Sequence, residues 1–269
     1  MLQNLHTHSS YCDGRDTPRE MIEAAIRLGF DSLGFSSHAN STSSLGSIMR
    51  DVDGYHKEIT ALKAEYSGRI KIYLGTELDR YSEGCIPDFK YDYLIGSTHS
   101  TKVGDEHIFY DMGLDVAEDA INRVLGGDSE EYFRLYYRTV AEMPSHIPMD
   151  IVGHFDLLTK YSEEKKLFDE DSRAYRSAAL EALSAVREKC ELFEVNTGAI
   201  GRGYRTTPYP APFILDEMRR LDCKLILSSD CHDSRKLDCN FKETLEYIKA
   251  HGFGELYYLT DSGFVPEKI

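Results

Sequence analysis

The sequence of 269 residues lacks the marks of secreted, membrane-spanning and disulfide-stabilised proteins. Met1 leads directly into Leu2 without a basic flank or a long apolar run before a cleavage site. No stretch approaches the roughly 18 consecutive apolar residues that a membrane span requires. The six cysteines are scattered without a Cys-x-x-Cys pair, which argues against a structural zinc knot and a disulfide framework. We therefore expect a soluble cytoplasmic protein with reduced, mostly buried thiols.

Positive charge is also scarce. Lys and Arg together number 31 against 46 Asp and Glu, which gives a formal net charge of -15. Nucleic-acid binding draws much of its affinity from Lys and Arg side chains that neutralise phosphates. The charge balance therefore favours a small-molecule substrate over DNA or RNA, and it leaves the oligomeric state open.

The chain has no repeat, low-complexity stretch or flexible linker, so we expect residues 1–269 to form a single domain. Short β-rich runs alternate with amphipathic segments, which is typical of βα units and here predicts a TIM-like barrel. We expect seven strands, near residues 2–5, 32–35, 70–74, 93–95, 151–152, 192–195 and 224–227. A further apolar run at 256–259 is either an eighth strand or an edge element.

The first helix has the clearest boundaries. A capping box at Thr17 and Glu20, with Pro18 between them, predicts its start, and Gly29 predicts its end. Apolar residues at helical spacing predict the other helices near 52–66, 129–143, 172–189, 212–221 and 241–251.

Metal-ligating or polar side chains follow every predicted strand. These residues are His6, His8, His38, Glu77, His99, His154, Asn196, Asp230 and His232. In a barrel the carboxyl ends of the strands converge on one face, so residues far apart in sequence can meet there. His6-x-His8 places both rings on one side of a strand, because side chains alternate with period two. Nitrogen and oxygen ligands without sulfur suit Zn, Mn or Fe, so this set predicts a metal site.

Six segments together resemble the polymerase and histidinol phosphatase (PHP) family of metal-dependent phosphoesterases. They are residues 6–14, 34–38, 75–77, 96–99, 151–156 and 228–232. Within that family, residues 193–198, followed by Arg202-Gly203 and Tyr209-Pro210, are similar to the histidinol-phosphatase members. The resemblance implies a distorted seven-stranded (β/α) barrel with its site at the carboxyl ends of the strands. It also implies hydrolysis of L-histidinol phosphate to L-histidinol and phosphate.

The resemblance further implies two or three divalent ions. His6, His8, Glu77 and Asp230 would hold the first, and Glu77 would bridge to a second held by His99 and His154. Asp13, His38 and His232 would hold a third. Two neighbouring ions can activate water and neutralise phosphoryl charge, which a reaction as slow as phosphate monoester hydrolysis requires.

Several further residues are candidates around this centre. Arg202 and Arg205 follow the sixth strand on a Gly-rich loop, and arginine suits phosphate better than lysine, so we expect them to bind substrate oxygens. We also place Asn196 at the substrate. Asp156 is either an acceptor that orients a histidine ligand or a general acid for the leaving alkoxide. We expect Glu77, Asp230 and Asp156 to serve catalysis.

Three alternatives stay open on the sequence. A PHP phosphoesterase acting on another small phosphate ester or on a nucleotide would use the same metals with a different rim. A non-catalytic metal-binding barrel would be expected to lack ligands, and all are present here. A metal-dependent amidohydrolase would ordinarily need a lysine ligand in mid-chain, and Lys102 is poorly placed for that role.

Overall fold

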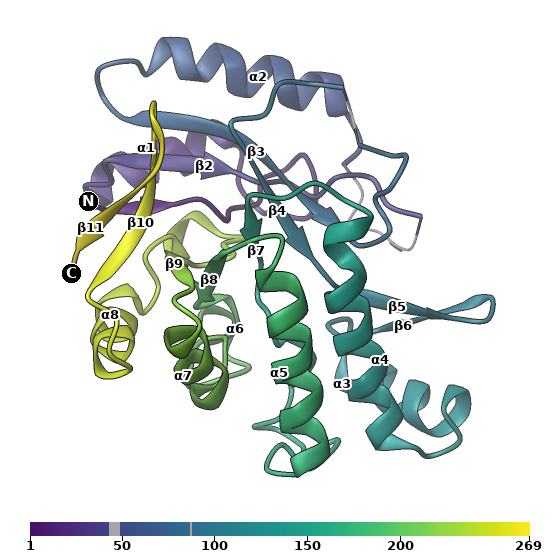
Figure 1. Ribbon diagram of the computed structural model, residues 1–269. Helices are drawn as coiled ribbons and strands as arrows, with labels where there is room; N and C mark the ends of the chain where they lie inside the picture. Colours follow the sequence, from purple (N-terminus) through teal and green to yellow (C-terminus); the bar gives the residue numbers. More distant parts are fainter. Residues whose placement is uncertain (43–48, 87) are drawn as a thin grey trace.

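Seven parallel strands form the centre of the protein in the computed structural model, which describes residues 1–42, 49–86 and 88–269. They pair in the order β1-β2-β3-β4-β7-β8-β9 and curve into a barrel (Figure 1). Their bounds are β1 Gln3–Asn4, β2 Ser32–Phe35, β3 Lys71–Asp79, β4 Tyr93–Ser97, β7 Ile151–Val152, β8 Leu192–Asn196 and β9 Lys224–Ser228. The predicted seven-stranded barrel is confirmed.

Helices cover the outside of the barrel (Figure 1). The longer ones are α1 Pro18–Leu28, α2 Val52–Glu65, α4 Ser129–Glu142, α5 Arg173–Arg187, α7 Pro212–Arg220 and α8 Phe241–Ala250. The predicted capping box is present, because the Thr17 side chain accepts from Glu20 N and the Glu20 carboxylate accepts from Thr17 N. Gly29 ends α1 at a φ of 79°, which a residue with a side chain rarely adopts.

The barrel closes at the carboxyl ends of its strands. Cys231 O accepts from His8 N at 2.8 Å, and Cys231 N donates to His6 O at 3.1 Å. These two bonds join the segment after β1 to the segment after β9. They hold the first and last histidine-containing segments of the predicted site side by side.

A hairpin covers the opposite end of the barrel. It consists of β10 Glu255–Thr260 and β11 Gly263–Lys268, which pair with each other and not with the seven-stranded sheet. The Gln3 side chain exchanges two hydrogen bonds with the backbone of Leu259, and Tyr73 Oη donates to Leu259 O. The apolar run at 256–259 is therefore an edge element and not an eighth strand.

The half of the barrel interior next to the β10–β11 hairpin is apolar. Leu259 packs there with inward-facing strand residues such as Tyr73, Tyr93, Ile95 and Ile226. Glycines at 34 and 75 leave room for the Tyr93 side chain, since a Cβ would lie 2.4 Å from its Oη at position 34 and 2.4 Å from its Cζ at position 75. This apolar packing confines the polar side chains to the half of the interior at the carboxyl ends of the strands.

Some elements were not predicted from the sequence. They are the hairpin of β5 Ser100–Val103 and β6 Glu106–Phe109, the short helices α3 Leu114–Asp119 and α6 Gly198–Arg202, a π-helical turn at Ala120–Val124 and strand β11. β3 extends beyond its predicted end, so Glu77 lies within the strand and not after it. No helix in the described parts of the chain is long and apolar enough to cross a membrane.

Candidate metal centre

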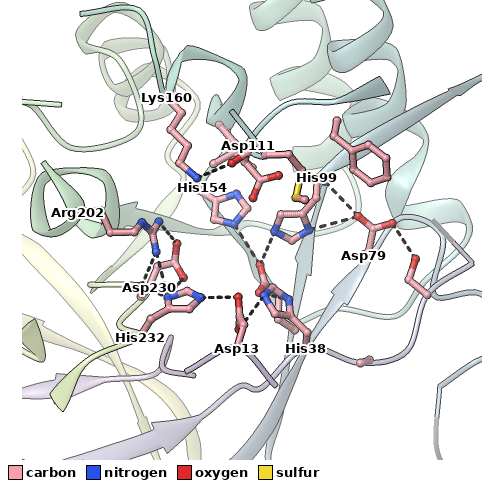
Figure 2. Close-up of a pocket in the computed structure, with 16 residues that line it drawn as sticks. Asp13, His38, Asp79, His99, Asp111, His154, Lys160, Arg202, Asp230 and His232 are labelled. Atoms are coloured by element: carbon pink, nitrogen blue, oxygen red, sulfur yellow. Dashed lines mark hydrogen bonds and ion pairs between the residues drawn. The ribbon is translucent and has the colours of Figure 1, made fainter. Parts of the chain in front are cut away.

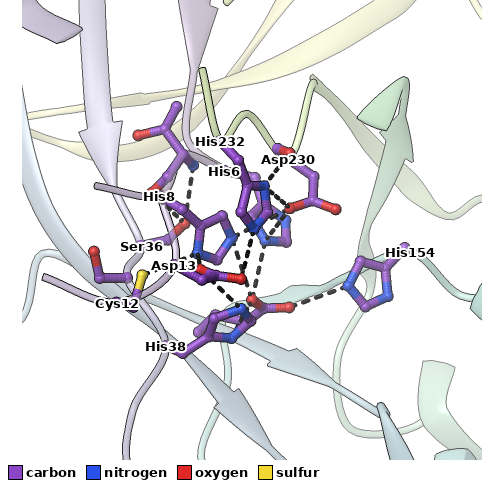
Figure 3. Close-up of polar contacts among 12 residues, drawn as sticks. His6, His8, Cys12, Asp13, Ser36, His38, His154, Asp230 and His232 are labelled. Carbon is purple, nitrogen blue, oxygen red and sulfur yellow. Dashed lines mark hydrogen bonds and ion pairs between the residues drawn. The ribbon is translucent and has the colours of Figure 1, made fainter. Parts of the chain in front are cut away.

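The first group of candidate ligand atoms comes from the segments that follow β1 and β9 and from Glu77 of β3. His6 Nε2 and His8 Nε2 lie 3.3 and 3.5 Å from Glu77 Oε2. The same two nitrogens lie 3.6 and 3.2 Å from Asp230 Oδ1 (Figure 3). Ligand atoms around a tetrahedral ion with bonds of about 2.0–2.1 Å would be separated by about 3.3–3.4 Å. The spacing within this group therefore suits a small divalent ion.

Buried atoms without a hydrogen-bond partner support this assignment. His6 Nε2, His8 Nε2 and Glu77 Oε2 are all buried, and none has a hydrogen-bond partner among the residues that the structure describes. Leaving a polar atom in this state costs about 1–3 kcal/mol. Three such atoms that converge on one point fit a metal ion as their shared partner.

Glu77 also faces a second group. Its other oxygen, Oε1, lies 3.1 Å from His154 Nε2 and 3.4 Å from His99 Nε2. His154 follows β7 and His99 follows β4, so neighbouring strands deliver both rings. Oε2 also lies 3.0 Å from His38 Nδ1. A carboxylate whose two oxygens face separate sets of histidines has the geometry of a bridging ligand.

The third group, Asp13, His38 and His232, lies closer to solvent. Asp13 Oδ2 is 3.1 Å from His232 Nε2, and Asp13 Oδ1 is 3.7 Å from His38 Nε2. The Asp13 side chain is 33% exposed, whereas those of His6 and His8 are fully buried. An ion held here would exchange with solvent more readily than one held by the first group.

The charges of the centre are consistent with cation binding. Burial alone would raise the pKa of Glu77, but His6, His38 and His99 hold it well below its usual range. Burial would lower the pKa of His6, but Glu194, Glu77 and Asp230 raise it well above the ordinary value. The carboxylates thus stay ionised while buried and raise the pKa of His6, His38 and His99. Burial and the neighbouring His232 and His38 instead lower the pKa of His8 to about 3. Divalent ions would supply the same positive charge.

The sequence analysis missed two carboxylates that support the ligands. Asp79 Oδ2 lies 3.3 Å from His99 Nδ1 and accepts from His99 N at 3.1 Å. Glu194 Oε1 lies 2.7 Å from His6 Nδ1. Glu194 interrupts an apolar run in β8, and that interruption was the signal available in the sequence. Asp79 is the last residue of β3, two positions after Glu77 and on the same side of the strand.

A cavity of about 340 Å³ opens onto the centre. Its walls include ligands from all three groups, and the cationic residues among the lining are Lys160 and Arg202 (Figure 2). Arg202 Nη2 donates to Asp230 Oδ2 at 2.7 Å, and Lys160 Nζ donates to Asp111 O at 2.9 Å. Arg202, predicted to bind substrate oxygens, thus lies on the cavity wall. Lys160 was not predicted, because a lone lysine after a short strand carries no recognisable pattern.

Besides His6 and His8, three predicted site residues do not line the cavity. Arg205 is buried, and its guanidinium donates to Thr159 O at 3.1 Å and to Thr207 O at 3.3 Å. Asn196 is fully buried and holds Glu194 Oε2 at 2.9 Å. Asp156 Oδ2 accepts from Ala211 N at 2.9 Å, and burial raises the pKa of Asp156 to about 6. Each of the three supports the loops around the cavity from behind.

Comparison with known proteins bears on these observations. A family model of the PHP domain matches residues 4–198. The chain belongs to the PHP domain family. Members similar to this chain include a probable histidinol-phosphatase of Deinococcus radiodurans, 28% identical over 93% of this chain and 94% of the relative. The histidinol-phosphatase of Bacillus subtilis is 27% identical over 90% of this chain and 97% of the relative.

A solved structure shows that the fold is shared. The histidinol phosphate phosphatase of Lactococcus lactis superposes with a TM-score of 0.73, at 21% identity, over 98% of both chains. That crystal structure is described as a complex with Zn, L-histidinol and phosphate. The chain thus has the PHP barrel along nearly its whole length, with His, Asp and Glu groups that could bind metal.

Proposed function

We propose that this chain is a histidinol-phosphatase, which hydrolyses L-histidinol phosphate to L-histidinol and phosphate. The observation that carries the proposal is one cavity that brings the three groups of ligand atoms together with Lys160 and Arg202. The similar L. lactis structure is described with Zn and both products of this reaction. We further propose two or three divalent ions, Zn, Mn or Fe, with the first two groups as the principal sites.

The phosphate end of the substrate would lie between the ligands and the two cations. Bound ions would supply an activated water and would polarise the phosphoryl oxygens. Arg202 lies against Asp230 and leaves part of its planar guanidinium toward the cavity, where it can donate to a phosphoryl oxygen. Lys160 adds a second positive charge on the same wall. Together they would hold the phosphoryl group against the ligands and stabilise charge that grows during hydrolysis.

The part of the cavity next to Lys160 suits a cationic leaving group. Phe109, Met112 and Leu157 give it an apolar wall, and Asp111 adds a carboxylate that lines the cavity. That carboxylate makes no hydrogen bond with any residue that the structure describes. The alkoxide side of histidinol phosphate carries an ammonium group and an imidazole. We propose that Asp111 pairs with the ammonium and that the apolar wall receives the ring.

We propose that residues 1–269 act as one catalytic unit. The family model ends at residue 198, yet Arg202, Asp230 and His232 come from the chain beyond it. The hydrogen bonds between Cys231 and the segment after β1 join the two parts at the centre itself. The centre therefore requires both parts of the sequence.

Substrate comparison tests the proposal. We expect kcat/KM for histidinol phosphate to exceed that for p-nitrophenyl phosphate and for a nucleotide, because contacts remote from phosphorus lower the barrier for the matching substrate. Asp111→Asn should lower kcat/KM for histidinol phosphate by about tenfold, as expected for loss of one ion pair of about 1.4 kcal/mol. For an analogue of histidinol phosphate that lacks the ammonium group, kcat/KM should be the same in Asp111→Asn as in the wild type.

Asp115→Asn is the matched control, since Asp115 is exposed in the first turn of α3 and does not line the cavity. This variant should leave kcat/KM unchanged for histidinol phosphate and for the analogue without the ammonium group. A nucleotide hydrolysed as fast as histidinol phosphate would assign the chain to another substrate of the family. Equal losses for both substrates in Asp111→Asn would refute the role of Asp111 alone.

A further inference from the structure

Glu194 lies in the barrel interior near the carboxyl ends of the strands, and each of its carboxylate oxygens has two polar neighbours. It sits in the middle of β8 and is completely buried. Oε1 lies 2.7 Å from His6 Nδ1 and also accepts from Ser228 Oγ. Oε2 accepts from His154 N at 2.8 Å and from Asn196 Nδ2 at 2.9 Å. A carboxylate with four such neighbours is fixed in both position and orientation.

The contact with His6 determines which ring nitrogen can bind a metal. An ionised carboxylate can only accept hydrogen bonds, so the proton of a neutral His6 ring belongs on Nδ1 beside Glu194. The lone pair is then on Nε2, which is the atom that faces Glu77 and Asp230. Histidine ligands commonly donate their second nitrogen to such an acceptor, which fixes the tautomer and raises the basicity of the ligand.

The contact with His154 reaches the second group of ligands. Glu194 holds the backbone N–H of His154, and the Nε2 of that residue lies 3.1 Å from Glu77 Oε1. Asn196 keeps Glu194 in place, because its own Oδ1 accepts from Gly198 N and its Nδ2 therefore faces the carboxylate. One side chain thus supports a ligand on each side of the bridging Glu77.

We infer that Glu194 is a positioning residue that presents His6 Nε2 and His154 to the metal centre and thereby sets its affinity for divalent ions. This inference rests on the proposed metal centre. A glutamine at this position would have the same shape but would need its amide NH₂ for one pair of neighbours. If the NH₂ faced His6 Nδ1, the ring proton would move to Nε2 and block the ligand atom.

Metal affinity measured on the folded protein tests the inference without an activity assay. We expect Glu194→Gln to bind Zn about 10–100-fold more weakly than wild type in competition with a chelator of known affinity. Glu191→Gln is the matched control, since Glu191 lies just before the same strand, is exposed and pairs with Lys224. That variant should bind Zn like the wild type.

The outcomes separate the inference from the proposal beneath it. A wild-type protein that binds no divalent metal would overturn the metal centre itself. A wild type that binds Zn, with Glu194→Gln bound as tightly, would overturn the positioning role. A role in folding alone would lower the melting temperature of the ion-free variant and leave the Zn affinity of its folded form unchanged.

A second measurement applies if Glu194→Gln does not fold. Nitrogen-15 NMR of the histidine rings in the Zn-loaded wild type reports which His6 nitrogen carries the proton. We expect the proton on Nδ1, with Nε2 coordinated. A His6 ring with an unprotonated Nδ1 would contradict the inference.

Discussion

Glu77 lies between the first two groups of candidate ligands, because each of its oxygens faces a different set of histidines. Glu77→Gln keeps the shape of the side chain and removes its charge. Two bound cations would then repel each other without a shared anion, so we expect turnover and metal content to fall together. Metal content by emission spectroscopy and kcat on a phosphate ester check this prediction.

Glu83→Gln is a suitable control for that change. Glu83 is exposed and contacts His146 outside the centre, so its neutralisation should alter neither quantity. A Glu77→Gln variant with the wild-type rate and full metal occupancy would contradict the bridging assignment.

The two arginines that the sequence placed at the phosphate should behave differently. Arg202 lines the cavity, so Arg202→Ala should raise KM for a phosphate ester. Arg205 contacts Thr159 and Thr207 and lies over the Tyr209 ring, 4.9 Å from its centroid. Its removal should leave KM unchanged and lower the free energy of unfolding by about 1–3 kcal/mol, because buried acceptors lose their donor. Steady-state kinetics and urea unfolding separate the two effects. A KM raised in Arg205→Ala but not in Arg202→Ala would contradict this assignment of roles.

At the scale of elements, Gly198 determines how closely α6 approaches the centre. A Cβ at this position would lie 2.9 Å from Arg202 Nη2, from Asn196 Oδ1 and from Asp230 Cβ. Arg202 can move, but Asp230 Cβ is attached to the backbone and cannot move as freely. Gly198→Ala should therefore displace Arg202 from Asp230, raise KM and lower the melting temperature.

Gly201→Ala in the same helix is the matched comparison. Its Cβ would meet Cys239 Sγ at 3.5 Å, which is an ordinary contact. We expect kinetics and melting temperature close to wild type for this variant. Equal effects at positions 198 and 201 would show that α6 responds to helix substitution in general and not to crowding at Asp230.

The elements also show how far the sequence could predict the structure. Short β-rich apolar runs located all seven barrel strands, because most of their residues are buried on both faces of the sheet. The hairpin β5–β6 was missed because Ser100, Thr101 and Lys102 give it no apolar alternation. The residues that gather at the centre could be predicted from the sequence because strand ends must converge in a barrel. It could not identify Lys160, or exclude Arg205, because side-chain direction within a loop depends on tertiary contacts.

At the scale of the whole molecule, the two ends of the barrel have different tasks. The β10–β11 hairpin and the apolar interior fill one end, where Leu259 packs against the strands. The other end concentrates buried carboxylates and histidines around a cavity with two cationic residues on its wall. The net charge of -15 would discourage long anionic partners, whereas the local charge of the cavity suits a small phosphate ester with a cationic group.

The most direct test of the central claim is removal and return of metal in the intact protein. The protein is stripped with a chelator and reloaded with Zn, Mn or Fe, and metal content and turnover of histidinol phosphate are measured on the same samples. We predict that turnover disappears with the ions and returns as they are restored, with saturation at two or three ions per chain. Full turnover in the stripped protein, or reloading to that level without turnover, would contradict the account.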